Sequence, residues 1–222
     1  MHYLIVANGS FLGKELLQKL IVNKTIVALD NAANRLRELE IQPHIVLGDF
    51  DSIENAEFWG IKKTFAELNN DDDEYDGNGV RIVPAKNQNY TDLQKAVQYC
   101  DAHHAQSITI VCATAGRLDH HESAVRLLRT AHRRPRSLVI HTDTQTLRYA
   151  TNEDVMIRGR VGDKCGILGF PYGRFSSSGL LYDVEDFELN FGYSDSTCNQ
   201  FLKEMVLLKI SGEALLVMPL SI

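Results

Sequence analysis

The chain has 222 residues, of which 44% are hydrophobic and 23% are charged, and its formal net charge is −6. These proportions are ordinary for a globular protein with one large domain or two small ones. The negative charge argues against nucleic acid as a partner, because nucleic-acid-binding domains carry basic surfaces. No apolar run is long enough to span a bilayer, and the first residues lack the basic segment of a signal peptide. We therefore expect a cytoplasmic protein that binds no membrane.

The first 143 residues alternate short apolar runs with segments of helical periodicity. The apolar runs fall at residues 3–7, 25–29, 44–47, 80–83 and 107–113, and the helical spacing falls at residues 11–22, 31–39, 53–68, 92–103 and 119–133. This alternation predicts βαβ units and a parallel sheet. Ligands bind such sheets outside the carboxyl ends of the strands. Polar residues that directly follow the apolar runs are therefore candidate site residues.

The segment Gly48-Asp49-Phe50-Asp51-Ser52 follows the third apolar run. In an extended segment the side chains of Asp49 and Asp51 point to the same side. Two carboxylates that close repel each other unless a cation neutralises them, and Mg²⁺ prefers such oxygen ligands. Asp30 also follows an apolar run, which favours a metal or phosphate site. The alternative is an acidic turn that caps the next helix.

Two further strand ends carry polar residues. Thr91 is a candidate cap for the helix over residues 92–103, and a helix N-terminus at a strand end is a natural anion site. Taken by itself, Asp92 is better explained as a residue that the helix dipole favours than as a metal ligand. Lys95 lies one turn later, where it reaches either a phosphate or solvent. Arg117 follows Gly116 and is suited to a bidentate phosphate contact, although a plain surface arginine is the commoner case.

The remaining sequence divides into an acidic segment and a β-rich C-terminal part. Residues 69–79, with five acidic side chains and no apolar periodicity, predict a solvated loop. From residue 144 to residue 222 short alternating runs are separated by glycines, which predicts an all-β sandwich domain. The last two runs flank Ser211-Gly212-Glu213 and predict a hairpin. We place the domain boundary at residue 143.

Four motifs occur together in the order GDFDS (residues 48–52), TDLQKA (91–96), GRLDH (116–120) and SGLLY with STCNQ (178–182 and 196–200). In this order and spacing they resemble the thiamin pyrophosphokinase family over essentially the whole chain. The resemblance implies a Rossmann-like α/β domain that binds ATP and Mg²⁺, followed by a β-sandwich domain that binds thiamine. It implies transfer of a pyrophosphoryl group from ATP to thiamine, giving thiamine diphosphate and AMP, by a homodimer with active sites at the subunit interface.

The resemblance also implies roles for individual residues. The expected metal ligands are Asp49, Asp51 and Asp92, and the expected catalytic residues are these three with Arg117 and Asp119. Arg117 would offset charge on the transferred group, and Asp119 would accept the alcohol proton. The expected nucleotide-binding residues are Asp30, Gln88, Thr91, Lys95 and Arg117. The expected thiamine-binding residues are Ser178, Tyr182, Ser196 and Asn199.

Two positions depart from the family pattern. Asn89 stands where the family usually has an aspartate, and Tyr182 stands where it often has a tryptophan. These departures leave two alternatives to the pyrophosphokinase interpretation. One is a metal-dependent nucleotide phosphohydrolase that uses the same aspartates. The other is a protein that binds thiamine or nucleotide without turnover.

Overall fold

The computed structural model describes residues 1–51, 53–61 and 74–221. The chain divides into two compact units, one of residues 1–127 with 133–137 and the other of residues 128–132 with 138–222. Among the helices in the described ranges, none has the length and apolar character that a membrane crossing requires. The architecture is rich in β-structure and contains few helices.

The first unit is built on parallel strands. They are β1 (His2–Val6), β2 (Thr25–Leu29), β3 (Ile45–Gly48), β5 (Val80–Pro84) and β6 (Ser107–Val111), with β4 (Tyr75–Gly77) at one edge. Hydrogen-bonded neighbours follow the order β6-β1-β2-β3-β5-β4. Every neighbouring pair is parallel except β4 with β5. The carboxyl ends of β2 and β3 therefore lie side by side, as the apolar runs predict.

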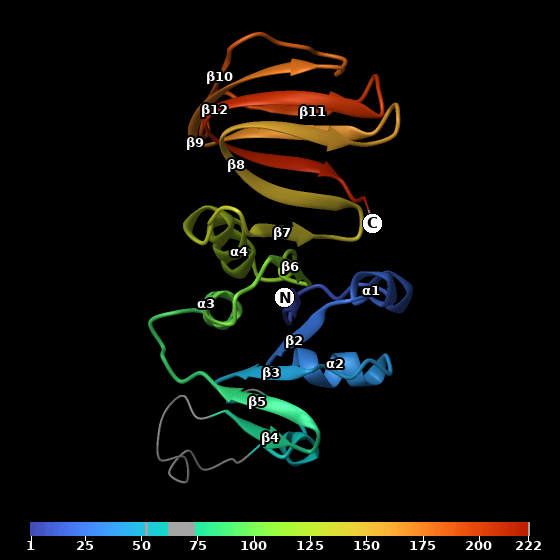
Figure 1. Ribbon diagram of the computed structural model, residues 1–222, viewed down its shortest axis with the longest axis vertical. Helices are drawn as coiled ribbons and strands as arrows, with labels where there is room; N and C mark the ends of the chain where they lie inside the picture. The colour runs from blue at the N-terminus through green and yellow to red at the C-terminus, as the bar shows by residue number, and fades with distance from the viewer. Residues whose placement is uncertain (52, 62–73, 222) are drawn as a thin grey trace. The chain divides into compact units, whose positions relative to one another are not determined.

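Helices cover both faces of these strands. They are α1 (Lys14–Leu20), α2 (Ala32–Glu38), α3 (Asp92–Ala102) and α4 (Leu118–Thr130), with the 3₁₀ turn η1 (Ala56–Trp59). Figure 1 shows α1 and α2 on the opposite side of the parallel strands from α3. Alternate strand residues such as Leu4, Val6 and Ile26 share a core with Leu17 and Leu36 of these two helices. Because both faces of the sheet are buried, the strands appear in the sequence as continuous apolar runs.

Two expectations for residues 53–79 are wrong where the structure describes them. The long helix expected over residues 53–68 is replaced by η1 at Ala56–Trp59, and residues 62–68 lie outside the described residues. The expected loop over residues 69–79 contains β4, in which Tyr75 pairs with Ile82 of β5. Residues 69–73 lie outside the described part. Strand pairing has outweighed the acidic composition of Tyr75–Gly77 here.

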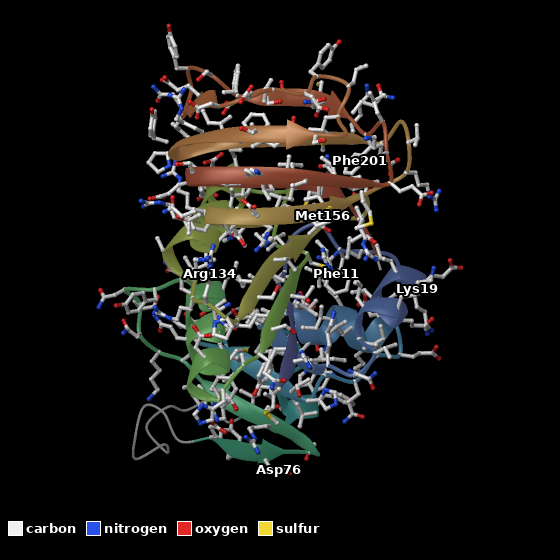
Figure 2. All side chains as sticks on the ribbon, turned by 45° about the horizontal axis from the view of Figure 1, so that its top comes forward. Phe11, Lys19, Asp76, Arg134, Met156 and Phe201 are labelled. Carbon is white, nitrogen blue, oxygen red and sulfur yellow. The ribbon has the colours of Figure 1, made fainter. Side chains whose placement is uncertain are left out.

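The second unit is antiparallel. Its strands are β7 (Ser137–His141), β8 (Gln145–Arg158), β9 (Lys164–Ser178), β10 (Phe187–Asn190), β11 (Ser196–Gln200) and β12 (Met205–Pro219). The order is β7-β8-β12-β9-β10, and β11 also pairs with β9. A core of this unit contains Phe175, Leu208 and Phe201, and the last of these is labelled in Figure 2.

The hairpin expected around Ser211-Gly212-Glu213 is wrong, because β12 runs through these residues without turning back. The register between β12 and β8 shifts between Ile210 and Glu213, which marks a β-bulge. Gly212 has a φ of 80°, and its amide donates to Asn152 Oδ1 at 2.8 Å. The glycine that suggested a turn thus serves a bend within one long strand.

Candidate active site

Asp30 and Gly48 together shape the end of the parallel sheet. A Cβ atom placed on Gly48 would lie 1.9 Å from Asp30 Oδ1, so the carboxyl group occupies the space that any other residue would fill. Asp30 Oδ1 also accepts a hydrogen bond from the Phe50 amide at 3.3 Å. The ends of β2 and β3 are therefore built around one carboxyl group that is largely enclosed.

Asp49 and Asp51 are not related by strand geometry, contrary to expectation. β3 ends at Gly48, and Phe50 has a φ of 62°, so the segment turns directly after the strand. Asp49 Oδ1 accepts from the Asp51 amide at 3.3 Å, and Asp49 Oδ2 accepts from Gln88 Nε2 at 2.9 Å. Burial alone would raise the pKa of Asp49, but the hydrogen bonds from Gln88 and Asp51 outweigh it and lower that pKa. Asp49 is thus held ionised and oriented at neutral pH.

Asp92 and Lys95 lie in the first turn of α3. This turn begins with a capping box, in which Thr91 Oγ1 accepts from the Gln94 amide and Gln94 Oε1 accepts from the Thr91 amide. Lys95 is buried, and its ammonium group donates to Asp92 Oδ1 at 2.9 Å and to the Ala85 carbonyl at 2.7 Å. Of the two interpretations of Lys95, solvent exposure is wrong. Its charge is directed at the carboxylate.

The carboxyl groups of Asp30, Asp49 and Asp92 influence one another. The pKa of Asp30 is raised from 3.8 to about 8, chiefly by burial and also by the charge of Asp92, a hydrogen bond between these two side chains and the charge of Asp49. Without a bound cation the cluster therefore retains a proton near neutral pH. This is the expected behaviour of an enclosed carboxyl group beside like charges.

The donor set fits Mg²⁺ held jointly with substrate phosphates. Within residues 1–51, 53–61 and 74–221, no three His, Cys, Asp or Glu side chains form a ready-made cage for a metal ion. Mg²⁺ does not require one, because it keeps several waters and binds one or two carboxylates plus phosphate oxygens. Asp49 and Asp92 provide such carboxylates, and their charges add to the effect of burial on the pKa of Asp30, so a bound cation would offset negative charge at this point.

Arg117 and Asp119 contact each other and not the carboxylate cluster. Arg117 Nη2 donates to Asp119 Oδ2 at 2.6 Å and Nε donates to Oδ1 at 3.1 Å, and both side chains are exposed. The loop before them is left-handed at Ala115 and Gly116. It is anchored where the Ala115 amide donates to His121 Nδ1 at 3.2 Å, a role that no sequence motif indicated. The Arg117–Asp119 pair is accessible to a substrate.

The predicted thiamine residues in the second unit fall into two kinds. Asn199 is 1% exposed, and its amide bonds to both the N–H and the C=O of Tyr182, at 3.1 and 2.9 Å, and to Ser196 Oγ at 3.4 Å. The side chain of Tyr182, in contrast, is 64% exposed, and Ser178 is also exposed. Asn199 thus fixes the backbone from which Tyr182 projects.

Asp183 is a residue of this region that the motifs did not single out. Its carboxylate accepts from the Gly179 and Leu180 amides. The sequence signal that could have identified Asp183 is the glycine four residues earlier, because a glycine predicts a tight turn that a nearby aspartate can hold. In the structure Gly179 has a φ of 112°.

Comparison with known proteins gives a consistent result. A family model described as "Thiamin pyrophosphokinase, catalytic domain" matches residues 17–140. Thiamin pyrophosphokinase 1 of Caenorhabditis elegans is 29% identical over 201 residues, covering 84% of this chain and 75% of the relative. Thiamine pyrophosphokinase 3 of Oryza sativa subsp. japonica is 24% identical over 195 residues, covering 82% of this chain and 67% of the relative.

Solved structures share the fold of the chain. A thiamine pyrophosphokinase from Bacillus subtilis superposes with a TM-score of 0.80 at 17% identity, and the match covers 100% of both chains. A thiamin pyrophosphokinase from Candida albicans gives a TM-score of 0.80 at 17% identity, covering 99% of this chain and 89% of the other. At these identities the likeness establishes the fold alone.

Proposed function

The chain belongs to the thiamin pyrophosphokinase family, and we propose that it transfers the pyrophosphoryl group of ATP to the hydroxyl of thiamine, giving thiamine diphosphate and AMP. The observation that carries this proposal is the carboxylate cluster formed by Asp30 and Asp49, which follow β2 and β3, and by Asp92 in the first turn of α3. It lies within the segment that the family model matches. Phosphoryl transfer depends mostly on positioning and charge stabilisation, and oriented carboxyl groups beside a buried lysine suit both.

The side chains around the cluster have distinct roles in this proposal. Asp49, Asp51 and Asp92 would hold Mg²⁺, which would neutralise charge on the triphosphate when bound. Gln88 orients Asp49, and Lys95 holds Asp92 while it adds positive charge toward the phosphates. Asp30 and Thr91 complete the expected nucleotide site, Asp30 by shaping the end of the sheet and Thr91 by fixing the start of α3.

The reaction forms a bond between the thiamine hydroxyl oxygen and the β-phosphorus of ATP. The bond from the β-phosphorus to the oxygen that bridges it to the α-phosphorus breaks, and AMP leaves with that electron pair. We assign Arg117 to the charge that develops on the transferred group and Asp119 to the hydroxyl proton. Because Arg117 and Asp119 are paired in the structure, a phosphate that takes Arg117 would free Asp119 to act as the base.

We assign residues 1–143 to a Rossmann-like domain for ATP and Mg²⁺, and residues 144–222 to a β-sandwich domain for thiamine. In the second domain Ser178, Tyr182 and Ser196 would contact thiamine, and the ring of Tyr182 suits its cationic thiazolium. Asn199 would act through the Tyr182 backbone that it holds. We further propose a cytoplasmic homodimer with active sites at the subunit interface.

Neutral variants of the carboxylates test this assignment. We expect Asp49→Asn and Asp92→Asn to lower kcat by about 100-fold or more at saturating Mg²⁺, because each removes a charged ligand. Asp154→Asn is the matched control, since Asp154 is exposed and lies on β8 in the other unit. AMP formation that depends on thiamine is the measured quantity. Full activity of Asp49→Asn and Asp92→Asn would show that the cluster is not the catalytic centre.

A further inference from the structure

The turn between β9 and β10 is held by the carboxylate of Asp183. Its Oδ2 atom accepts from the Gly179 amide at 2.8 Å, and its Oδ1 atom accepts from the Leu180 amide and from Ser177 Oγ, both at 2.9 Å. Gly179 has a φ of 112°, a conformation that is strained for residues with a side chain. Three donors therefore converge on one carboxylate, which keeps this turn in a specific conformation.

Two further sets of hydrogen bonds hold the same turn, one between Ser177 and Val184 and one between Asn199 and Tyr182. Ser177 Oγ accepts from the Val184 amide at 3.2 Å, and the Ser177 amide donates to the Val184 carbonyl at 2.9 Å. On the far side the buried amide of Asn199 bonds to both backbone groups of Tyr182. Asp183 adds to these two sets the bonds from the Gly179 and Leu180 amides, which neither Ser177 nor Asn199 accepts.

Two of the exposed side chains of the turn are not used within the unit. Ser178 and Tyr182 are exposed, and in the part of the chain that the structure describes neither side chain has a hydrogen-bond partner. The Asp183 carboxylate, in contrast, is occupied by three donors. Burial alone would raise the pKa of Asp183, but the Gly179 and Leu180 amides and the Ser177 hydroxyl outweigh it and lower that pKa, so the group is charged at neutral pH.

From this geometry we propose that Asp183 is a positioning residue for the acceptor substrate, holding the turn so that Ser178 and Tyr182 are preorganised for a cationic heteroaromatic ring. The inference rests on the proposed function, because it assumes that this turn lines the thiamine site. It assigns to Asp183 an effect on acceptor binding and none on the binding of ATP. Preorganisation of this kind improves affinity by lowering the cost of ordering the site.

Asp183→Asn is the informative variant because it preserves size while it removes one acceptor atom. Whichever way the amide is placed, its NH₂ group faces at least one of the three donors. We expect the KM for thiamine to rise about tenfold, with kcat and the KM for ATP changed less than about twofold. Asp186→Asn is the matched control, since Asp186 lies three residues away in the same connection and its carboxylate pairs with Arg174 of β9. It should leave both KM values unchanged.

A second variant keeps the test decisive if Asp183→Asn does not fold. Ser177→Ala removes one donor to the carboxylate and also the acceptor of the Val184 amide, and we expect the KM for thiamine to rise about threefold at unchanged kcat. Active wild-type enzyme with an unchanged thiamine KM in these variants would overturn the inference and leave the proposed function intact. Equal losses for thiamine and ATP would also overturn it, because they indicate general destabilisation. Wild-type protein that makes no thiamine diphosphate would overturn the proposed function and this inference with it.

Discussion

Replacing Gly48 with alanine tests whether the end of β3 is built around Asp30. The added Cβ would lie 1.9 Å from Asp30 Oδ1 and 2.6 Å from its Cγ, far inside van der Waals contact. Either the carboxyl group or the backbone of β3 must move by about 1 Å or more to relieve the overlap. A crowded substitution of this kind costs about 1–3 kcal/mol of folding stability.

Movement of the Asp30 carboxyl group should also lower the enzymatic activity. Asp30 interacts with Asp92 and Asp49 and accepts from the Phe50 amide, so a shift of its carboxyl group moves the other carboxylates. A misplacement of about 1 Å in a positioned site can cost about 100-fold in rate. We therefore expect Gly48→Ala to lower kcat/KM by about that factor while the protein remains folded.

Urea unfolding and steady-state kinetics measure the two effects. Gly13→Ala is the matched control, because a Cβ at Gly13 has no heavy atom within 4 Å and the position has an ordinary φ of −64°. Its stability should change by less than about 1 kcal/mol and its activity should not change. If Gly48→Ala were as stable and as active as Gly13→Ala, the proposed packing of Asp30 against the strand would be refuted.

Three further predictions concern charge and buried polar groups. The pKa of Asp30 is raised from 3.8 to about 8, so folding takes up a proton between these values, and stability should fall as pH rises from about 4 to about 8. In the absence of divalent cations, Asp30→Asn should reduce the difference in unfolding free energy between pH 5 and pH 8 by about 1–4 kcal/mol, as measured with urea. An unchanged difference in the variant would contradict the assignment. Lys95→Met should cost about 1–3 kcal/mol of stability and lower activity, because it removes the buried bonds to Asp92 and Ala85. Lys14→Met, which breaks an exposed ion pair, should cost less than about 1 kcal/mol. Equal losses of the two variants in thermal unfolding would be evidence against a buried role for Lys95. Asn199→Ala should cost about 1–3 kcal/mol and raise the KM for thiamine by releasing Tyr182, and unchanged kinetics would exclude that role.

Local patterns predicted the elements of the first unit outside residues 53–79. The apolar run at residues 25–29 is β2, and Thr91 caps α3 as its hydroxyl group predicts. These features depend on near neighbours in the sequence, since burial on two faces gives a continuous apolar run and capping involves residues three apart.

Features that depend on distant contacts were not predictable. Nothing in the local sequence shows that the Gly48 position is filled by the carboxyl group of Asp30, or that the Lys95 ammonium is buried. The same holds for β12, where Gly212 suggests a turn but the bond from its amide to Asn152 fits a bulge in a continuous strand. In each case tertiary contacts decide between conformations that the local sequence permits equally.

Phosphorus NMR of the purified protein with ATP, Mg²⁺ and thiamine tests the proposed activity most directly. The proposed function predicts equal amounts of AMP and a thiamine-linked diphosphate, which together identify attack at the β-phosphorus and thiamine as the acceptor. ADP and free phosphate formed without regard to thiamine would mean that the carboxylate cluster hydrolyses nucleotides. Binding of thiamine and ATP without any turnover would mean a binding protein, and either of these results would contradict the proposed activity.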